Sequence, residues 1–386
     1  MGMIRPRNKL EKDTTIAGHF SELTDPRIDR TKRHKLVDII TIAICSTLSM
    51  GETWDAMEEF GQTHEQWLRK FLELPNGIPS HDTFNRVFAR IDPDQFRTCF
   101  ISWVKSIEPK FDGDIIPIDG KTVRGSHDRA NGNKAIHMVS AWACRSSLVL
   151  GQLKTEEKSN EITAIPKLLD LLEIKGCVVT IDAMGCQKKI ANKIVEKQAD
   201  WVFGLKGNQS TFHQDVIAWF ESLDLNRWCR DPSVFLETKE KNHGRLETRR
   251  YYYFTDHSLG RYAEQWKGFR GIGMVESIRD NGKKVTTERR YYIASMSGDV
   301  KRFAQAVRSH WGIENILHWV LDVSFSEDAN RTRKGHAPEN SAILRHIALN
   351  ILRKDTTSKK SITLKRLRAG WDTDYLEQLL DVLQAA

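Results

Sequence analysis

Cysteine is scarce in this sequence and is never paired at short spacing. The chain has 386 residues, and its six cysteines lie at positions 45, 99, 144, 177, 186 and 229. The absence of any C-x-x-C pair argues against a zinc ribbon or a zinc finger. Scattered single cysteines are typical of a reducing cytosol. We therefore expect a cytoplasmic protein.

Long hydrophobic runs are also missing. The first residues, MGMIRPRNKLEKD, lack the apolar run of a signal peptide. The most apolar early stretch, Leu36 to Met50, contains Asp38 and is shorter than the roughly 20 residues that cross a bilayer. We interpret it as a buried helix and expect no membrane partner.

Several catalytic motifs are absent as well. The sequence contains no G-x-x-x-x-G-K-[ST], G-x-S-x-G or H-E-x-x-H, the patterns of phosphate-binding loops, serine hydrolases and zinc proteases. What the chain does have is an excess of basic residues, with 59 Lys and Arg against 51 Asp and Glu, a formal net charge of +8. That excess favours a polyanionic partner such as nucleic acid.

The hydrophobic pattern changes near residue 110. Before it, apolar residues recur at helical spacing; after Pro109, short β-rich runs appear. Strands are predicted at 115–118, 137–143, 148–153, 178–181 and 201–205, and helices at 161–172 and 187–198. This order predicts a mixed sheet begun by a meander and completed by βα units.

We expect two domains, a helical one over residues 1–110 and an α/β one over residues 111–386. The second is predicted to contain a β-rich insertion at about 225–300, a long helix at about 300–323 and a basic helical tail. The segment Lys359 to Arg368 holds five Lys and Arg and no acid. It is either a solvated helix face or a phosphate contact.

Two aspartates follow apolar runs that are predicted to be strands: Asp119 in IIPIDGKTVRG and Asp182 in CVVTIDAMG. Ligand sites of open α/β sheets gather at the carboxyl ends of the strands. The two aspartates would therefore lie side by side if their strands are neighbours. The alternative is two unrelated turn aspartates.

A third acid, Glu314, lies beside an apolar stripe of the predicted long helix. Burial disfavours a charged carboxylate unless a cation compensates. That cation is either a metal ion or a neighbour such as Arg308 or His310, and a buried salt bridge is the simpler alternative. Three carboxylates together suit Mg²⁺, which prefers oxygen ligands, and two such ions can promote phosphodiester displacement.

At these acids the sequence resembles bacterial DDE-class insertion-sequence transposases, in the group that contains the H-repeat-associated proteins. The resemblance lies in the stretches PIDGKTVRGS, KSNEITAIP, VTIDAMGCQKKIA, LKGNQ, HGRLETR, RSHWGIENILHWVLDVSFSEDANR and ENSAILRHIALN. It implies an RNase H-like mixed-sheet core with a mainly β insertion, preceded by an α-helical N-terminal domain.

The resemblance also implies a chemistry. Asp119, Asp182 and Glu314 would be the catalytic, metal-binding residues, holding Mg²⁺ or Mn²⁺, with two ions expected. The partners would be double-stranded DNA, both element ends and target, bound by a homodimer in the cytoplasm or at the nucleoid. The sequence departs from related transposases at Val307, His310 and Leu321, where those enzymes often have Tyr, Arg and Lys, so these roles do not transfer.

The nearby acids Asp322, Glu327 and Asp328 are alternatives to Glu314 as the third acid. Other residues are candidates for DNA contacts or for support of the site. The candidate DNA contacts are Lys121, Arg124, Lys206, Asn208, His243, Arg245, Arg249, Asn85, Arg86 and Arg90. Asn85, Arg86 and Arg90 lie opposite the apolar stripe of a predicted helix that begins after Ser80. The candidate supporting residues are His310, Asn315 and His318.

These observations predict a DNA transposase, which cuts element ends and joins the freed 3′-hydroxyl to target DNA. Two alternatives stay open. One is an inactive or immobile DNA-binding relic of a transposase. The other is a metal-dependent nuclease without strand transfer.

Overall fold

The computed structural model describes residues 16–128, 131–132, 134–156, 161–242, 245–255 and 257–381. The chain folds into two compact units. Among the described residues, the helical unit comprises those up to Lys110, those within Val123–Ile136 and those from Val320 onward. The sheet unit comprises Phe111–Thr122 and the described residues within His137–Trp319. The chain therefore passes between the units more than once, and the segment after Val320 packs with the N-terminal helices.

The helical unit confirms the helical N-terminal region. Its helices are α1 (Ile16–Phe20), α2 (Leu36–Leu48), α3 (Trp54–Thr63), α4 (Glu65–Leu68), α5 (His81–Phe88), α6 (Pro93–Ile107), α13 (Ala337–Lys354), α14 (Ile362–Trp371) and α15 (Thr373–Asp381). The predicted buried helix is α2, whose residues from Asp38 to Leu48 are all buried. In the described part of the chain, no helix combines the length and apolarity that a membrane crossing requires.

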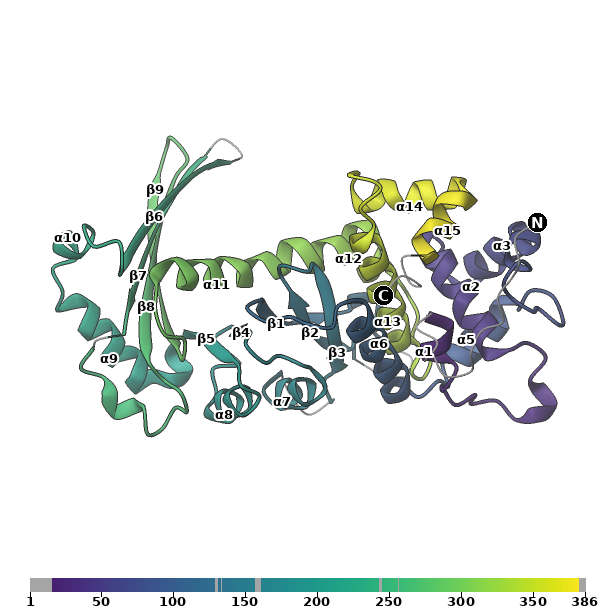
Figure 1. The fold of residues 1–386 in the computed structure, drawn as a ribbon, viewed down its shortest axis with the longest axis horizontal. Helices are drawn as coiled ribbons and strands as arrows, with labels where there is room; N and C mark the ends of the chain where they lie inside the picture. The colour runs from purple at the N-terminus through teal and green to yellow at the C-terminus, as the bar shows by residue number, and fades with distance from the viewer. Residues whose placement is uncertain are drawn as a thin grey trace, which may run out of the picture. The chain divides into compact units, whose positions relative to one another are not determined.

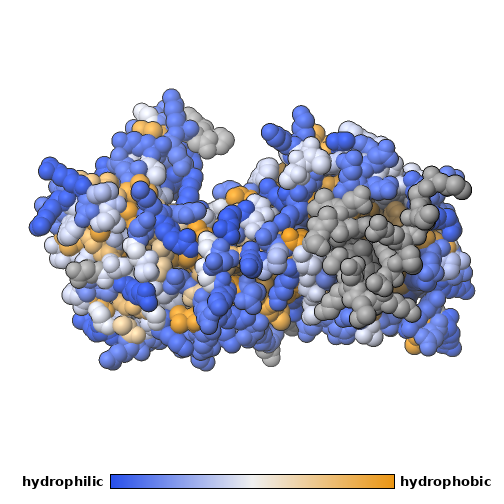
Figure 2. Space-filling model, viewed as in Figure 1, coloured by the Kyte–Doolittle hydropathy of each residue, from blue (hydrophilic) through white to orange (hydrophobic). Residues whose placement is uncertain are grey.

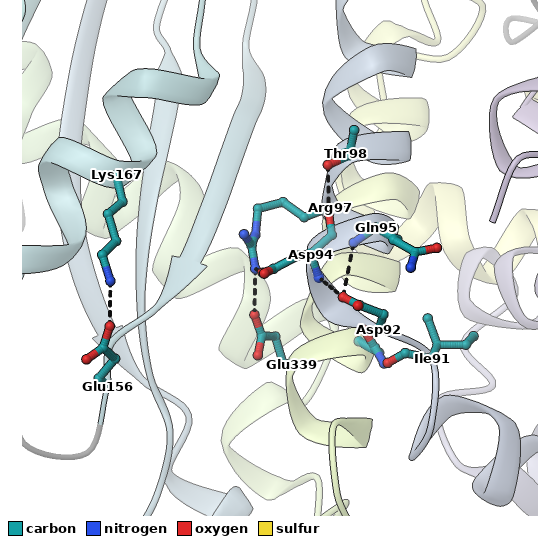
Figure 3. Close-up of polar contacts among 10 residues, drawn as sticks. Ile91, Asp92, Asp94, Gln95, Arg97, Thr98, Glu156, Lys167 and Glu339 are labelled. Atoms are coloured by element: carbon teal, nitrogen blue, oxygen red, sulfur yellow. Dashed lines mark hydrogen bonds and ion pairs between the residues drawn. The ribbon is translucent and has the colours of Figure 1, made fainter. Parts of the chain in front are cut away.

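The start of α6 shows how local sequence fixes a helix boundary. Asp92 Oδ1 accepts hydrogen bonds from the backbone N of Asp94 at 2.8 Å and of Gln95 at 3.3 Å, and Pro93 occupies the first turn (Figure 3). These are the preferred residues for a helix N-terminus. One turn later Arg97 donates to Asp94 and, at 3.1 Å, to Glu339 of α13. An ion pair thus joins segments far apart in the sequence.

The basic segment Lys359 to Arg368 was predicted to be either a solvated helix face or a phosphate contact. The structure differs from the first of these predictions. Lys365 and Arg366 of α14 are buried. Arg366 pairs with Glu52 at 2.7 Å and donates to the backbone oxygens of Thr47, at 2.7 Å, and Ser324. Lys365 donates to the backbone oxygens of Leu352 and Asp355, at the end of α13 and just after it. Nothing in the local sequence separates Arg366 from its exposed neighbours, because Glu52 and Thr47 come from the other end of the chain.

The sheet unit contains nine strands in the order β3-β2-β1-β4-β5-β9-β8-β7-β6. The first five are β1 (Ile115–Thr122), β2 (His137–Ala143), β3 (Leu148–Lys154), β4 (Val178–Ile181) and β5 (Asp200–Leu205). Strands β1, β2 and β3 pair antiparallel, and β1, β4 and β5 run parallel. This order and these directions are those of an RNase H-like core, which confirms the expected fold.

The β-rich insertion continues the same sheet from the edge of β5. It consists of β6 (Phe235–Asn242), β7 (Arg245–Phe254), β8 (Gly271–Asp280) and β9 (Val285–Ala294), all antiparallel to their neighbours. The turn that begins at Asp280-Asn281-Gly282 joins β8 to β9, with Gly282 at φ +79. These strands form a long ribbon whose free end is predominantly hydrophilic (Figures 1 and 2).

Helices cover both faces of the five-stranded core. The long helix α11 (Val300–Ile313) lies on one side, and α7 (Glu161–Leu171) and α8 (Lys188–Glu196) lie on the other (Figure 1). Buried residues of α11, including Phe303 and Val307, pack in one cluster with Ile115, Val178 and Val202 of the sheet. The remaining helices, α9 (Ser210–Glu221) and α10 (Leu225–Trp228), precede the ribbon. The long helix is therefore anchored across the strands that carry the two aspartates.

Candidate active site

The two aspartates come together because their strands are neighbours. Asp119 is on β1, and Asp182 directly follows β4. The parallel register places Ile118 opposite Ile181, so the next residue of each strand is an aspartate. The backbone N of Gly185 donates to Asp182 Oδ1 at 3.1 Å, which orients that carboxylate.

Glu314 lies where the long helix changes its winding. After α11 ends at Ile313, residues Glu314–His318 form a π-helical turn, and α12 (Trp319–Ser324) follows. A π turn adds a residue to the helix and is frequent at functional sites. The uniform α-helix assumed from the sequence did not include it. His318, at the other end of this turn, places Nδ1 3.6 Å from Asp119 Oδ2.

One cavity of about 360 Å³ is lined by all three acids, Asp119, Asp182 and Glu314. Its wall also includes Lys206 after β5 and His310 of α11. Further lining residues come from β9, among them Arg289, Arg290, Tyr291 and Tyr292. The cavity therefore gathers three carboxylates at the strand ends and helix, and its ribbon side carries two arginines that are paired with Glu288 and Glu276.

Asp119 has the most perturbed carboxyl group of the three acids. Burial, followed by repulsion from Glu161, raises its pKa from 3.8 to about 7, with smaller contributions from Asp182 and Glu314. A hydrogen bond from the backbone of Gly120 acts in the opposite direction. Ionised carboxylates repel each other and lose hydration on burial. A bound cation would relieve both costs.

Glu161 is an acid near this site for which no role was predicted. It is the first residue of α7, and its Oε1 is 2.8 Å from His137 Nε2. A Cβ atom added at Gly120 would lie 2.1 Å from Glu161 Oε1, so the pair packs directly over the residue after Asp119. The stretch KSNEITAIP was one of the family-like motifs, but no local pattern indicates that its glutamate approaches β1.

Two of the candidate residues near the acids, His310 and Asn208, make hydrogen bonds that support the site. His310 is hydrogen-bonded through Nδ1 to Thr180 Oγ1 of β4 at 3.1 Å. Its burial lowers the pKa of the imidazole, although Asp182 acts in the opposite sense, so we expect it to be neutral at pH 7. Asn208 donates through Nδ2 to Ala183 O at 2.6 Å. Asn208 therefore holds the loop that carries Asp182.

The basic residues of the insertion line a second cavity, of about 410 Å³. Arg249 pairs with Glu240 at 3.0 Å and also with Glu247, and Arg245 pairs with Glu247 at 2.6 Å. Asn315 lines this cavity as well. Lys121 lies on β1 two residues beyond Asp119, on the same face of the strand by alternation. His243 lies outside the described residues.

The remaining candidates belong to the helical unit. Arg124 is 81% exposed and its Nε lies 3.5 Å from Asp328 Oδ2, while Glu327 is buried 3.6 Å from Arg345. Two of the alternative third acids are therefore paired with cations, whereas Glu314 shares a cavity with both aspartates. Asn85, Arg86 and Arg90 lie on or just after α5, with both arginines exposed.

The donor chemistry of the acid-lined cavity fits a hard divalent cation, because its acidic side chains offer only carboxylate oxygens. Within the residues that the structure describes, no three acidic, histidine or cysteine side chains are grouped closely enough to hold one metal ion. The three acids thus surround a shared cavity rather than a single point.

Comparison with known proteins gives matches along nearly the whole chain. Residues 17–104 match the family model described as DDE_Tnp_1-associated, and residues 110–351 match the one described as Transposase DDE domain. "Putative transposase YncI" of Escherichia coli O157:H7 is 41% identical over 95% of this chain and 94% of its own. "H repeat-associated putative transposase YhhI" of Escherichia coli K12 is 41% identical over 94% of this chain and 96% of its own.

Among solved structures, a piggyBac transposase synaptic complex with hairpin DNA aligns with 95% of this chain and 78% of its own. Its TM-score is 0.37 and its sequence identity 11%, which is too low to show a shared fold.

Proposed function

This chain belongs to the DDE transposase family, and on that basis we propose that it cuts DNA at the ends of its own mobile element and joins the freed 3′-hydroxyl to target DNA. The observation that carries the proposal is the single cavity lined by Asp119, Asp182 and Glu314. Three acids separated by long stretches of sequence are brought together there by parallel strand pairing and by the long helix.

The three carboxylates are the residues that would hold divalent metal ions, Mg²⁺ or Mn²⁺. Divalent ions would supply activation of the attacking oxygen and stabilisation of the leaving one, and a pair of ions can do both. The raised pKa of Asp119 supports this assignment, because a group whose ionisation is disfavoured without a cation gains most when one binds.

Other residues of the cavity have roles in positioning. His310, neutral and fixed by Thr180, keeps the helix that carries Glu314 in register with β4. His318, at 3.6 Å from Asp119, orients that carboxylate or accepts a proton from it. Lys206 lies on the cavity wall, where its ammonium group would bind the phosphate next to the scissile bond.

DNA would extend from this cavity along the basic residues. Arg245, Arg249 and Asn315 line the adjoining cavity, and Lys121 lies on the strand of Asp119. All four are suited to phosphate contacts that set affinity without reading sequence. Pairing two element ends for joining requires two protomers, so we propose a homodimer on DNA.

The test uses the purified full chain, a labelled duplex that spans the element boundary, and Mg²⁺ or Mn²⁺. Wild type should nick at the boundary, and Asp182→Asn should abolish nicking. The matched control is Asp170→Asn, which removes an acid that is paired with Lys193 on the surface of the same unit. Equal cutting by wild type and Asp182→Asn would show that the catalytic assignment is wrong.

The same reaction separates the alternatives. Joined products with a target plasmid identify a transposase, and cutting without joining identifies a nuclease. Salt-dependent DNA binding with no cutting under either ion identifies a relic.

A further inference from the structure

A loop rich in basic residues lies beside α5 in the helical unit. A cavity of about 530 Å³ is lined by Asn85 of α5, by residues 53–55 at the start of α3, and by residues 329–334. The loop follows a short 3-10 turn (Glu327–Ala329) and carries Arg331, Arg333 and Lys334. We call residues 331–334 the basic loop.

The basic loop is attached to the end of α5 by backbone contacts. The backbone N of His336 donates to Ala89 O at 3.1 Å. Gly335 has φ +53, and a Cβ atom there would lie 2.5 Å from the same oxygen, so no larger residue fits without moving the backbone. The close approach of loop and helix thus depends on glycine.

A second set of hydrogen bonds holds both sides of the loop. Asn340 Nδ2, in the first turns of α13, donates to the backbone oxygens of Phe88 at 2.8 Å and Ile91 at 3.0 Å. Before the loop, Asn330 Nδ2 donates to Glu52 O at 3.3 Å, and its Oδ1 accepts from Thr332 N at 2.9 Å. The loop is therefore presented in one conformation relative to α5.

Charge is unbalanced on this surface. Arg331 and Lys334 are exposed and Arg333 is half-buried. Arg86 and Arg90, one helical turn apart, are exposed as well. The acids that flank them are Asp55, which lines the cavity, and Asp82, exposed in the first turn of α5.

These five cations differ from the buried arginines of the helical unit. In the described part of the chain, none of the five forms an ion pair with an acid, whereas Arg97, Arg345 and Arg366 are all paired. Arg333 Nε is shielded from solvent and has no hydrogen-bond partner among the described residues. A fixed surface with five uncompensated cations is suited to a polyanion.

We infer that α5 and the basic loop together form one recognition surface for duplex DNA, in which Asn85 contacts base edges in the major groove and the basic loop holds the flanking phosphates. The inference rests on the proposed function and deepens it. It adds the basic loop, which follows the helix that carries Glu314, to the surface that would contact DNA. The buried apolar face of α5, formed by Phe84, Val87 and Phe88, fixes which side of the helix faces outward.

The chemistry of each part matches a different feature of the duplex. The major groove admits an α-helix, and an asparagine amide can bond both N6 and N7 of adenine. Arginine forms strong, paired hydrogen bonds with phosphate oxygens. Phosphate contacts set register and affinity, and base contacts set sequence preference. Substitutions in the basic loop should therefore lower the affinity for any duplex, whereas substitution of Asn85 should lower the preference for one sequence.

Fluorescence anisotropy of a labelled duplex that carries the element end, measured with the full chain in EDTA, tests the inference. Arg331→Gln with Arg333→Gln should weaken binding roughly 30-fold at 0.15 M salt, equally for element-end and unrelated duplexes, and should reduce the slope of log affinity against log salt by about 2. Asn85→Ala should instead reduce the preference for the element end by roughly 5- to 150-fold.

The matched control is Lys105→Gln with Lys110→Gln, which removes the same charge from exposed positions elsewhere in the unit. An equal loss of affinity in this control, or an unchanged salt slope in the loop variant, overturns the inference. So does binding of single-stranded DNA as tight as that of duplex.

A second variant, Arg331→Lys with Arg333→Lys, keeps the positive charge and distinguishes loss of charge from misfolding. Retained binding supports the inference, and a loss in this folded variant equal to that of the glutamine variant overturns it. EDTA removes divalent ions, so this assay measures DNA binding without cleavage. A protein that binds through this surface in EDTA but does not cut DNA when Mg²⁺ or Mn²⁺ is added would overturn the proposed function and leave this inference standing.

Discussion

Replacing Asp119 by asparagine should abolish activity while making the metal-free protein more stable at neutral pH. The pKa of Asp119 is about 7 in the folded chain against 3.8 for an ordinary aspartate, because of burial and of repulsion by Glu161, Asp182 and Glu314. At about 1.36 kcal/mol per pH unit, that difference corresponds to at most about 4 kcal/mol. Asparagine has nearly the same shape and carries no charge to destabilise the fold.

The direction of this pH dependence follows from the linkage between folding and proton binding. A carboxyl group whose pKa is raised by folding favours the folded state fully below pH 3.8, and that contribution is lost as the pH rises through about 7. The difference in stability between Asp119→Asn and wild type should therefore be small at pH 4 and about 1–4 kcal/mol in favour of the variant at pH 8. Urea unfolding in EDTA, followed by tryptophan fluorescence, measures both values.

A control with the opposite sign is Asp215→Asn. Hydrogen bonds from Tyr262 and Arg261 lower the pKa of Asp215, so this variant should be less stable than wild type at pH 8. Adding Mg²⁺ should stabilise wild type and not Asp119→Asn, because only the native state of wild type gains a ligand. Destabilisation by Asp119→Asn at pH 8, or an equal gain at both pH values, would refute the electrostatic explanation.

Two further predictions concern the helical unit. Arg366→Met should lower the free energy of unfolding by about 3–5 kcal/mol, because it leaves Glu52 buried without its 2.7 Å partner. Adding Glu52→Gln to this variant should recover part of the lost stability. No recovery would contradict the pairing of Arg366 with Glu52. Gly335→Ala should cost about 1–3 kcal/mol, because φ is +53 and Ala89 O lies 2.5 Å from the new Cβ. Thermal unfolding measures the second, and unchanged stability would mean that the loop can move away from α5.

Local pattern was sufficient for most of the core. The predicted strands at 137–143 and 178–181 have those bounds in the structure, and the helix predicted at 161–172 ends one residue earlier. These segments have a clear hydrophobic period and are bounded by turn residues, so neighbouring residues alone specify them. The π turn at Glu314–His318 was missed, because one inserted residue barely changes the helical pattern.

The contacts that local pattern could not predict all join distant parts of the chain. Glu161 approaches Gly120 because α7 packs against β3 and β2, and β2 is the neighbour of β1. Arg366 of a basic tail is buried against Glu52 and Thr47, more than 300 residues away in sequence. A charged residue has the same local signature on a surface as in a buried pair, since the difference lies in its partner.

The sequence by itself determined the class of the protein, its succession of helices and strands, and the three acids that we propose as ligands. Those properties depend on residue type and on periodicity over a few turns. Only the tertiary structure decided that β1 lies beside β4, that Glu314 shares a cavity with both aspartates, and that the loop after Asn330 is fixed against α5. These are statements about which surfaces pack together, and packing is set by the sum of many weak contacts that no single stretch of sequence contains.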